Sequence, residues 1–588
     1  MSASTREILN SVPRCTAQWL LPGSTWITAW IATLAIGAGI ALRLWRIKID
    51  GMVDTDSGYY IIFANYYREI ILHHSPHYFG LDTQAKPGFM LLAFFTSLVF
   101  GLEGYSLPAL NAVLAGGIGF IIYRIAQLVF RSATVSASAL ILAMFVPFLI
   151  DLDRKGLAHG AVTLAILLSI YMLLKWSTYP WVLRRGSLIG SGLALGVAFL
   201  CHPTVFFYVV TLGAIVLAIS LSVTKPTLRE KAMPAFVFFA AAAAPVLFAE
   251  LFYRVVFLVW PELIGLRNPA YARFFGFGYI GDLLNHFHSA EVYKANVKAL
   301  GTVAGDGAED PAFFINTLRM FRVDAIGVVY AVGVTCSSVY LIWRYWAERR
   351  VQYIVMLAVA YTPLLMMAFN PFFGQFARSL HATLPLFMLV LAVGMADLMQ
   401  YAAANASLPR AYASAVTITL TILFAADGAR AFVGDYHKAI NAPNYLANSA
   451  RLPDLIFTDL AERGIIKVYL YQNVFGLQWW YYLKKHYNAL PSALENPNAR
   501  PVPEVRVISD PDDLERMVKA GKVEAVILLI RPRADGAPFL DETERKQAEQ
   551  FPELVTRLGG REIMNDKTSP IYSKWVRVFE FSRVAGRP

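Results

Sequence analysis

Long apolar runs separated by short polar segments fill most of the first 431 residues. The first run spans about Trp26 to Leu44 and follows a segment that carries Arg6 and Arg14. Runs of about 18 or more apolar residues predict transmembrane helices. Eleven further runs lie near residues 88–104, 107–130, 134–151, 157–175, 187–202, 204–222, 233–258, 323–345, 351–370, 382–400 and 411–431. The pattern therefore predicts a polytopic α-helical membrane protein.

The basic residues indicate which of these runs cross the membrane. Arginine and lysine cluster between runs, and cytoplasmic segments carry an excess of both. All of the clusters are cytoplasmic if the run at 88–104 does not cross. That run begins KPGF, contains Thr96 and Ser97 and ends GLEG, so we interpret it as an interfacial or partly inserted helix. We therefore expect about 11 transmembrane helices, a cytoplasmic N-terminus on an uncleaved signal-anchor, and outer loops at 45–106 and 260–322.

The pattern changes after Asp435, where strand-like runs alternate with helical ones. Helical patterns occur in LQWWYYLKKHY, DDLERMVKAG and ETERKQAEQF, and strands are predicted at 465–471, 505–509, 523–530 and 575–581. The alternation predicts a soluble, extracytoplasmic α/β domain at 433–588, after a transmembrane catalytic domain at 1–432. Neither GxGxxG nor a Walker sequence occurs in it, so nothing indicates nucleotide binding. We favour a capping or acceptor-positioning role.

Composition agrees with a membrane protein. It argues against a soluble globular protein, a nucleic-acid-binding protein and a protein held together by disulfides or zinc. The chain has 57% hydrophobic and 16% charged residues, whereas soluble domains have about 45–50% and about 25%. Its net charge of +11 does not indicate nucleic-acid binding, because the basic residues follow the topology instead of forming a stripe. The cysteines Cys15, Cys201 and Cys336 are too far apart in sequence to suggest a disulfide framework or a zinc site.

Three aspartates, Asp50, Asp54 and Asp56, stand where the chain leaves the first apolar run. Such a carboxylate can take a proton from an attacking hydroxyl or amine, hold a divalent cation, or pair with a cation. A solvated turn, or a helix N-cap at Asp56, is the plainer interpretation. The aromatic stretch SGYYIIFANYYREIILHH that follows predicts a helix lying in the interface, whose dipole favours a negative charge at Asp56. We predict that Asp56 is the catalytic base, that Asp54 assists it, and that Asp50 is structural.

Four stretches resemble a known family, and their order and spacing are more specific than any one alone. They are DSGYY from 56, KPGFMLL at 86–92, GLALGVAFLCHPTV at 192–205 and RSLHATLPLFMLVLAVGMADL at 378–398. The family is the polytopic glycosyltransferases with the C-type fold, in the branch of dolichyl-phosphate-mannose protein mannosyltransferases and the lipid A aminoarabinose transferase. The resemblance implies transfer of a sugar, with inversion, from a polyprenyl-phosphate donor on the outer membrane face.

The chain departs from the family pattern at several site positions. Its acidic dipeptide is Asp56-Ser57, so Asp54 is expected to supply the second carboxylate. In the second outer loop, Asp151, Asp153 or His159 stands for the family's acid, and Asp153 is our catalytic candidate. The resemblance and the charges together give candidate phosphate ligands Lys86, Arg378, Arg154 (or Lys155) and His202, which replaces the family's lysine. Membrane snorkelling is the alternative role for these cations. Candidate positioning residues are Tyr59, Tyr60, His159 and His381.

The sequence does not decide whether the protein binds a metal ion. The candidate ligands are Asp54, Asp56, His286, His288 and Glu291, and HHSPH adds histidines after the first acidic motif. Histidines at an interface more often pack or bind backbone groups, so we predict no certain cofactor and leave a divalent cation open.

The sequence as a whole predicts an inverting membrane glycosyltransferase acting on a glycan, lipid or protein acceptor. A transporter or flippase is the main alternative, but it would be expected to show repeated halves and charges near the membrane midplane. A lipid-linked oligosaccharide ligase or polymerase and a scaffold are further alternatives. We expect the protein in a bacterial inner (plasma) membrane, with the active site and C-terminal domain in the periplasm.

Overall fold

The structure, a computed structural model, describes residues 24–50, 55–73, 86–178, 185–222, 227–259, 325–348, 350–369, 380–440, 451–471, 504–508, 511–529, 542–564 and 576–581. Several predicted site residues lie outside these ranges: Asp54, Arg378, His286, His288 and Glu291. Asp56 and Tyr59 lie within a described helix, but the positions of their side chains are outside the description. The whole of the predicted outer loop at 260–322 is also outside it.

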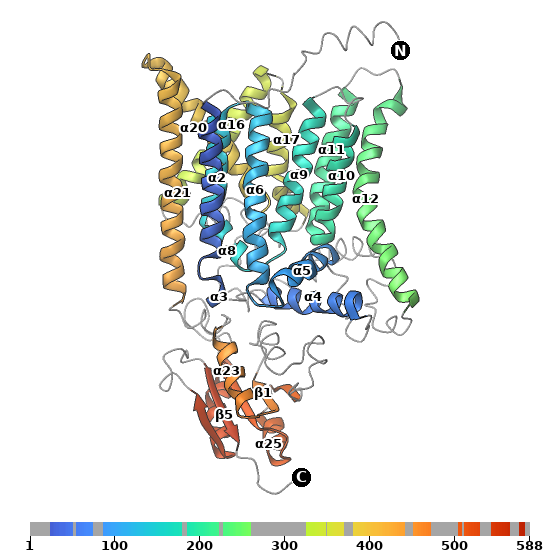
Figure 1. Ribbon diagram of the computed structural model, residues 1–588, viewed down its shortest axis with the longest axis vertical. Helices are drawn as coiled ribbons and strands as arrows, with labels where there is room; N and C mark the ends of the chain where they lie inside the picture. Colours follow the sequence, from blue (N-terminus) through green and yellow to red (C-terminus); the bar gives the residue numbers. More distant parts are fainter. Residues whose placement is uncertain are drawn as a thin grey trace.

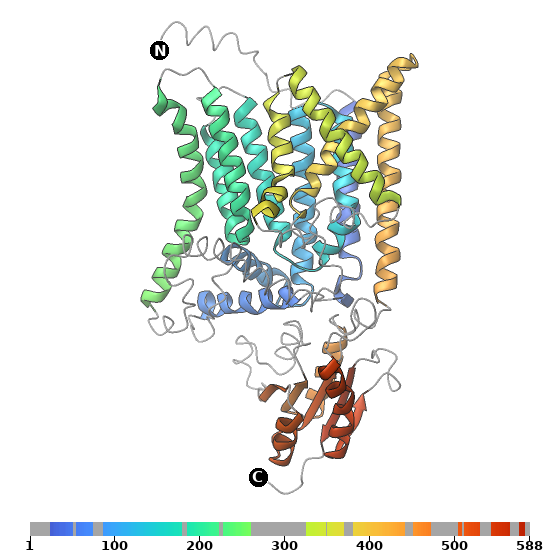
Figure 2. The same cartoon turned by 180° about the vertical axis from the view of Figure 1, so that it is seen from behind.

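A bundle of long apolar helices forms the larger part of the molecule (Figure 1, Figure 2). The bundle helices are α2 (Ser24–Leu44), α6 (Ser106–Phe130), α7 (Ala133–Phe145), α9 (His159–Thr178), α10 (Arg185–Cys201), α11 (Phe206–Ser222), α12 (Leu228–Val259), α16 (Ala325–Glu348), α17 (Val351–Ala360), α18 (Thr362–Phe369), α20 (Leu384–Asn405) and α21 (Arg410–Ile440). Many large apolar side chains on the bundle are exposed, such as Phe248 and Leu258 on α12. A surface of this kind suits lipid, not water, and the chain is an integral membrane protein.

Within the described residues, six helices are long and apolar enough to cross a membrane, or seven if the bent pair α7 and α8 (Pro147–Arg154) counts as one span. Four shorter apolar helices, Ala29–Leu44, Pro87–Phe100, Arg185–Cys201 and Val351–Ala360, fall below the length of the others. The count of eleven spans therefore stays a prediction.

Two helices run across one end of the bundle instead of along it (Figure 1). They are α4 (Thr55–His73) and α5 (Pro87–Phe100). The 14 residues of α5 give a length of about 21 Å, which is shorter than a hydrocarbon core of about 30 Å. Pro87 starts α5, and Gly101 follows it with a φ of 74°. This is the arrangement expected for the run at 88–104. We call this end of the bundle the α4 side.

The chain bends by 53° between α7 and α8, on the α4 side. Val146 between them is extended, and Pro147 begins α8. Proline lacks the N–H that would continue the hydrogen bonding of α7, and it disfavours the helical conformation in the residue before it. The break therefore leaves carbonyl groups at the end of α7 in need of other partners, which matters for the site below.

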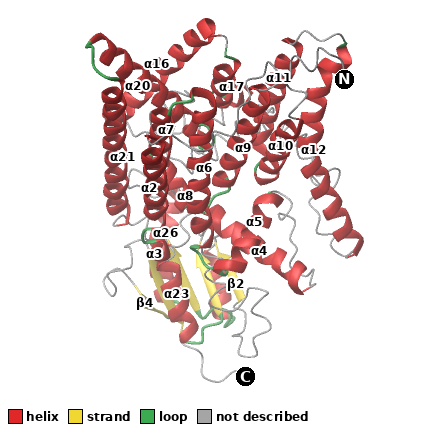
Figure 3. Cartoon of the chain, turned by 45° about the horizontal axis from the view of Figure 1, so that its top comes forward, coloured by secondary structure: helices red, strands yellow, loops and turns green. Residues whose placement is uncertain are grey.

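A five-stranded sheet forms beyond the α4 side (Figure 3). Its order is β2 (Glu504–Ile508), β1 (Lys467–Tyr471), β3 (Ala525–Leu529), β5 (Val576–Phe581) and β4 (Gly560–Met564). β1 pairs in parallel with β2 and β3, and β5 is antiparallel to both β3 and β4. Four of these strands overlap the predicted ones. We did not predict β4, because GREIM is short and two of its five residues are charged.

Side chains alternate between the two faces of the sheet, as the period of a strand requires. Val468, Ile527 and Val578 lie in one buried cluster with apolar residues of α23 (Arg451–Glu462). Tyr469 and Val526 belong to a second cluster with α25 (Pro511–Lys519) and α26 (Glu542–Arg557). Helices therefore cover both faces, and the helical patterns DDLERMVKAG and ETERKQAEQF correspond to α25 and α26. LQWWYYLKKHY lies outside the described residues.

Candidate active site

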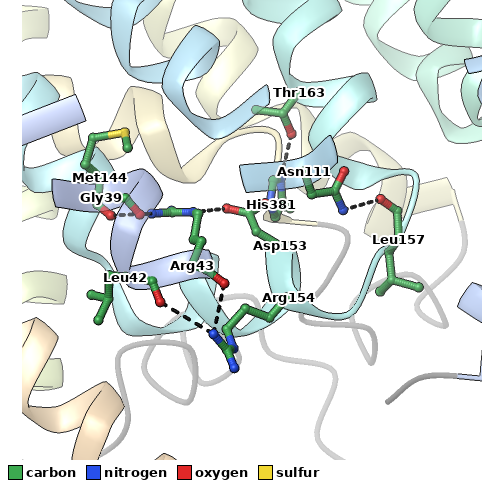
Figure 4. A network of polar contacts seen from close by, with 10 residues as sticks. All are labelled: Gly39, Leu42, Arg43, Asn111, Met144, Asp153, Arg154, Leu157, Thr163 and His381. Atoms are coloured by element: carbon green, nitrogen blue, oxygen red, sulfur yellow. Dashed lines mark hydrogen bonds and ion pairs between the residues drawn. The ribbon is translucent and has the colours of Figure 1, made fainter. Parts of the chain in front are cut away.

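A buried charge network lies on the α4 side of the bundle, with Asp153 at its centre (Figure 4). Asp153, near the end of α8, is 2% exposed. Arg43 Nε donates to its Oδ2 at 2.7 Å, and His381 Nε2 lies 3.1 Å from its Oδ1. Arg43 is 2% exposed and His381 1%. An aspartate can be this deeply buried because both oxygens have charged or polar partners.

Arg43 comes from the last turn of α2, where the apolar pattern of that helix ends. Its Nη1 donates to the carbonyl oxygens of Gly39 at 3.0 Å and Met144 at 2.9 Å. Met144 lies in the last turn of α7, so the guanidinium supplies one of the partners that the α7–α8 break requires. A cation at a helix C-terminus is also favoured by the helix dipole.

His381 connects Asp153 to a third part of the bundle. It lies in the turn before α20, and its Nδ1 is 2.6 Å from Thr163 Oγ1 on α9. An ionised carboxylate only accepts hydrogen bonds, so the Nε2 of His381 carries the proton and donates to Asp153. In that neutral tautomer, Nδ1 accepts a hydrogen bond from the Thr163 hydroxyl. The network joins α2, α7, α8, α9 and the turn before α20.

Arg154 follows Asp153 but has different partners. Its Nη1 donates to the carbonyl oxygens of Trp45 at 2.6 Å and Arg43 at 2.9 Å, just past and within the last turn of α2. Its guanidinium also lies 5.2 Å from the ring centroid of Tyr436 and 5.5 Å from that of Phe432, on α21. Arg154 therefore ties α8 to the ends of α2 and α21. Its predicted role at a donor phosphate is not tested by these contacts.

Lys86 stands at the N-cap of α5 beside α4. Its Nζ donates to the Tyr60 hydroxyl at 2.5 Å and lies 5.0 Å from the centroid of that ring. The Tyr60 ring packs edge-on against Phe89 with centroids 4.8 Å apart. Tyr60 is 1% exposed while Lys86 is half-buried. The ammonium group is thus held at a fixed place on the α4 side by a residue of the aromatic stretch.

Three predicted histidines gather near the start of α9. The ring centroid of His159 lies 5.6 Å from that of His202 and 6.1 Å from that of His381. His202 lies between α10 and the short 3-10 helix η3 (Pro203–Val205), with its Nδ1 2.8 Å from Thr204 Oγ1. In the described part of the chain, no group of three or more histidine, cysteine or acidic residues has an arrangement that could hold a metal ion.

The N-terminus of α4, which carries Asp56, is attached to the turn between α8 and α9. Ser57 Oγ donates a short hydrogen bond to the carbonyl oxygen of Lys155. In the same turn, Lys155 Nζ pairs with Asp151 Oδ2 at 2.9 Å, and Asp151 is 52% exposed. The structure therefore brings the N-terminus of α4 next to the turn between α8 and α9.

The structure separates the three second-loop candidates by environment. Asp151 lies on the surface, Asp153 is buried with both oxygens engaged, and half-buried His159 faces other histidines. Sequence reasoning did not identify Arg43 or Thr163 as parts of this site. For Arg43 a signal existed: an arginine in the last turn of an apolar helix needs a partner or a path to the interface. For Thr163, inside an apolar run, no signal existed.

The structure is similar to solved membrane transferases. It matches ArnT from Cupriavidus metallidurans bound to undecaprenyl phosphate, with a TM-score of 0.53 and 14% identity, covering 95% of this chain and 99% of that one. It matches the oligosaccharyltransferase of Archaeoglobus fulgidus in the apo form, with a TM-score of 0.52 and 13% identity, covering 95% and 74%. A complex of the Archaeoglobus fulgidus enzyme AglB with an inhibitory peptide and a dolichol-phosphate matches with a TM-score of 0.52 and 13% identity, covering 96% and 75%.

No family model matches the sequence, and no curated protein matches it. At identities of 13–14% a structural likeness shows the fold and not the reaction. The resemblance predicted from the four motifs is confirmed at that level, since the neighbours are C-type glycosyltransferases. This chain has the C-type glycosyltransferase fold.

Proposed function

We propose that the protein is an inverting glycosyltransferase that moves a sugar from a polyprenyl-phosphate donor to an acceptor outside the cytoplasm. The observation that carries this proposal is the meeting of three segments at one end of a C-type fold. These are the N-terminus of α4 with Asp56, the turn at Lys155, and Lys86 at the start of α5. Two of the solved neighbours hold undecaprenyl phosphate or a dolichol-phosphate, which supports a donor of this class.

Cations are needed where the donor bond breaks, because the leaving phosphate gains negative charge. We propose that Lys86 and His202 meet this charge, joined by Arg378 from the segment before His381. Lys86 suits the task because Tyr60 holds its ammonium group in place before the substrate arrives. His159 and His381, with Tyr59 and Tyr60, are proposed to position the donor and acceptor.

We propose that Asp56 is the general base. Its carboxylate accepts the proton of an acceptor hydroxyl or amine while that oxygen or nitrogen attacks the anomeric carbon. The bond from this carbon to the phosphate oxygen breaks on the opposite face, and its electron pair leaves with the phosphate, so the configuration inverts. Asp54 assists Asp56. Asp153 has its oxygens engaged by Arg43 and His381, so its geometry favours a positioning role over direct proton transfer.

The orientation and the domains belong to the same proposal. We infer about eleven spans, a cytoplasmic N-terminus, and a transmembrane catalytic domain at 1–432 with its α4 side facing the periplasm of a bacterial inner membrane. We further infer an extracytoplasmic α/β domain at 433–588 that contributes to acceptor positioning. The sheet lies beyond the α4 side (Figure 3), which supports this arrangement. No divalent cation is assigned, because four of the five candidate ligands lie outside the described residues.

The experiment that tests this proposal is sugar transfer by the purified chain from labelled polyprenyl-phosphate sugars. We expect transfer by the native protein and near-total loss in Asp56→Asn. Asp513→Asn is the matched control, since Asp513 is exposed on α25 and pairs with Arg516 at 3.2 Å. Full activity in Asp56→Asn at native melting temperature would remove this residue from the chemistry. Absence of transfer from every donor, together with movement of a lipid-linked sugar across vesicle membranes, would instead indicate a flippase.

A further inference from the structure

We propose that Arg43 is a positioning residue for the transfer reaction. Together with Asp153 and His381 it holds α4, α8 and α9 in the relative places that bring the proposed catalytic groups together. This inference rests on the proposed function. In this role Arg43 does not contact the donor or the acceptor. It acts through the helices that its hydrogen bonds hold in place.

The first step is the fixation of α8 against α2 and α7. Arg43 uses Nε for Asp153 and Nη1 for the carbonyl oxygens of Gly39 and Met144. One planar guanidinium therefore joins the last turns of α2 and α7 to a carboxylate on α8, across the 53° break. With these three partners in place, the angle between α7 and α8 has little freedom.

The second step leads from α8 to the proposed catalytic base. Lys155 lies two residues after Asp153, and its carbonyl oxygen accepts the hydrogen bond of Ser57, the neighbour of Asp56. The next residue, Gly156, has a φ of 68°, and a Cβ placed there would lie 2.9 Å from Pro108 Cδ. The turn is thus packed tightly against the start of α6. A shift of α8 would move this turn and the N-terminus of α4 with it.

The third step leads from Asp153 to the histidine cluster. His381 binds Asp153 with one ring nitrogen and Thr163 with the other. Thr163 and His159 are four residues apart on α9, so they lie on the same side of that helix. The contact with Thr163 therefore sets the rotation of α9 about its axis and directs His159 toward His202, 5.6 Å away. The buried network therefore positions both the N-terminus of α4, which carries Asp56, and the histidines near the start of α9.

Lysine could not replace arginine in this role. A lysine keeps the positive charge but offers one nitrogen on a flexible stem, whereas the guanidinium presents donors in a fixed planar fork. An Arg43→Lys variant would pair with Asp153 and lose the simultaneous contacts to the carbonyl oxygens. This difference separates positioning from charge balance.

The matched control is a second arginine ion pair farther along the bundle. Arg344 on α16 pairs with Asp397 on α20 at 2.7 Å and with Glu348 at 2.6 Å. Asp397 lies about 20 Å along α20 from Leu384, the first residue after the turn of His381. Arg344→Lys therefore makes the same chemical change away from the proposed site.

The experiment compares the two variants as full-length protein in lipid nanodiscs. We expect Arg43→Lys to lower kcat about 10- to 100-fold with an unchanged KM for the donor, because a misplacement of about 1 Å can cost that much. Arg344→Lys should keep the native kcat. An equal loss of kcat in both variants would show that only general rigidity is affected, and a native kcat in Arg43→Lys would refute the proposal.

A second measurement does not depend on the reaction. Backbone hydrogen exchange over residues 57–67 of α4 should become at least about 10-fold faster in Arg43→Lys and stay native in Arg344→Lys. Unchanged exchange in Arg43→Lys would overturn the positioning role whether or not transfer is observed. Faster exchange in a protein that transfers no sugar would instead refute the proposed function. It would still show that Arg43 holds α4 in place.

A double variant separates positioning from the burial of charge. In Arg43→Met with Asp153→Leu, both charges are replaced together, which leaves no buried charge unpaired. We expect a protein that still unfolds cooperatively and a kcat still reduced about 10-fold or more. Recovery of the native kcat in this variant would show that Arg43 serves only to neutralise Asp153.

Discussion

The Nζ atom of Lys86 lies 2.5 Å from the hydroxyl oxygen of Tyr60 and 5.0 Å from the centroid of the same ring. The two residues are 26 positions apart in sequence, at the N-cap of α5 and on the buried face of α4. The contact fixes an ammonium group beside the segment that carries Asp56. This pair gives the first prediction.

We expect Lys86→Met to raise the KM for the lipid-linked donor about 10- to 100-fold, because a hydrogen bond to a charged group contributes about 1.5–3 kcal/mol. Initial rates against donor concentration measure this change. Tyr60→Phe keeps the cation and the aromatic ring and removes only the hydroxyl, so it should raise KM less than Lys86→Met. A native KM in Lys86→Met would exclude the ammonium group from donor binding.

Asp153→Asn should destabilise the protein by about 3–5 kcal/mol, because it leaves the charge of Arg43 buried without its counter-ion. Thermal unfolding in detergent, followed by tryptophan fluorescence, measures the effect. Asp427→Asn is the control: Asp427 is 31% exposed and pairs with Arg430 at 3.4 Å, so the change should cost less than about 1 kcal/mol. Equal melting temperatures for the two variants would contradict a large contribution of the Asp153 contacts to the free energy of unfolding.

Arg154→Ala tests whether this arginine serves the structure or the donor phosphate. Its contacts with the Trp45 and Arg43 carbonyl oxygens and with the Tyr436 ring predict a loss of about 2 kcal/mol or more in stability. They also predict an unchanged KM for the donor. A native melting temperature combined with a raised KM would support the phosphate role expected from the sequence.

Gly196 on α10 gives a prediction for helix packing. A Cβ added there would lie 2.3 Å from the carbonyl oxygen of Ala242 on α12, and one at Gly192 would lie 2.5 Å from that of Phe238. Small residues four apart allow two helices to approach closely in a membrane. Gly196→Ala should therefore cost about 1–3 kcal/mol in thermal stability.

Gly37→Ala on α2 is the matched control, because an added Cβ there has no neighbour within 4 Å beyond the adjacent backbone of α2 itself. It should be neutral or slightly stabilising, since alanine favours the helix over glycine by about 1 kcal/mol. A Gly196→Ala protein as stable as Gly37→Ala would mean that α12 can move away without cost.

Much of the architecture could be predicted from the sequence because hydrophobic period and charge are local properties. The apolar runs marked the bundle helices. The distribution of basic residues and the polar interruptions of the run at 88–104 distinguished α5 from the helices of the bundle. Alternating runs after Asp435 predicted four of the five strands. β4 was missed, because five residues with little apolar alternation become a strand only when a partner, here β5, pairs with them.

For the candidate site, too, some features could be predicted from the sequence and others could not. The sequence by itself determined which residues were chemically able to act, among them Asp56, Lys86, Asp153 and His381, because their types and their positions at helix ends can be read directly. Only the tertiary structure decided that Asp153 is buried between Arg43 and His381, contacts that join residues 110 and 228 positions apart. A buried charge is stable only with a partner, and the fold, not the local sequence, supplies that partner.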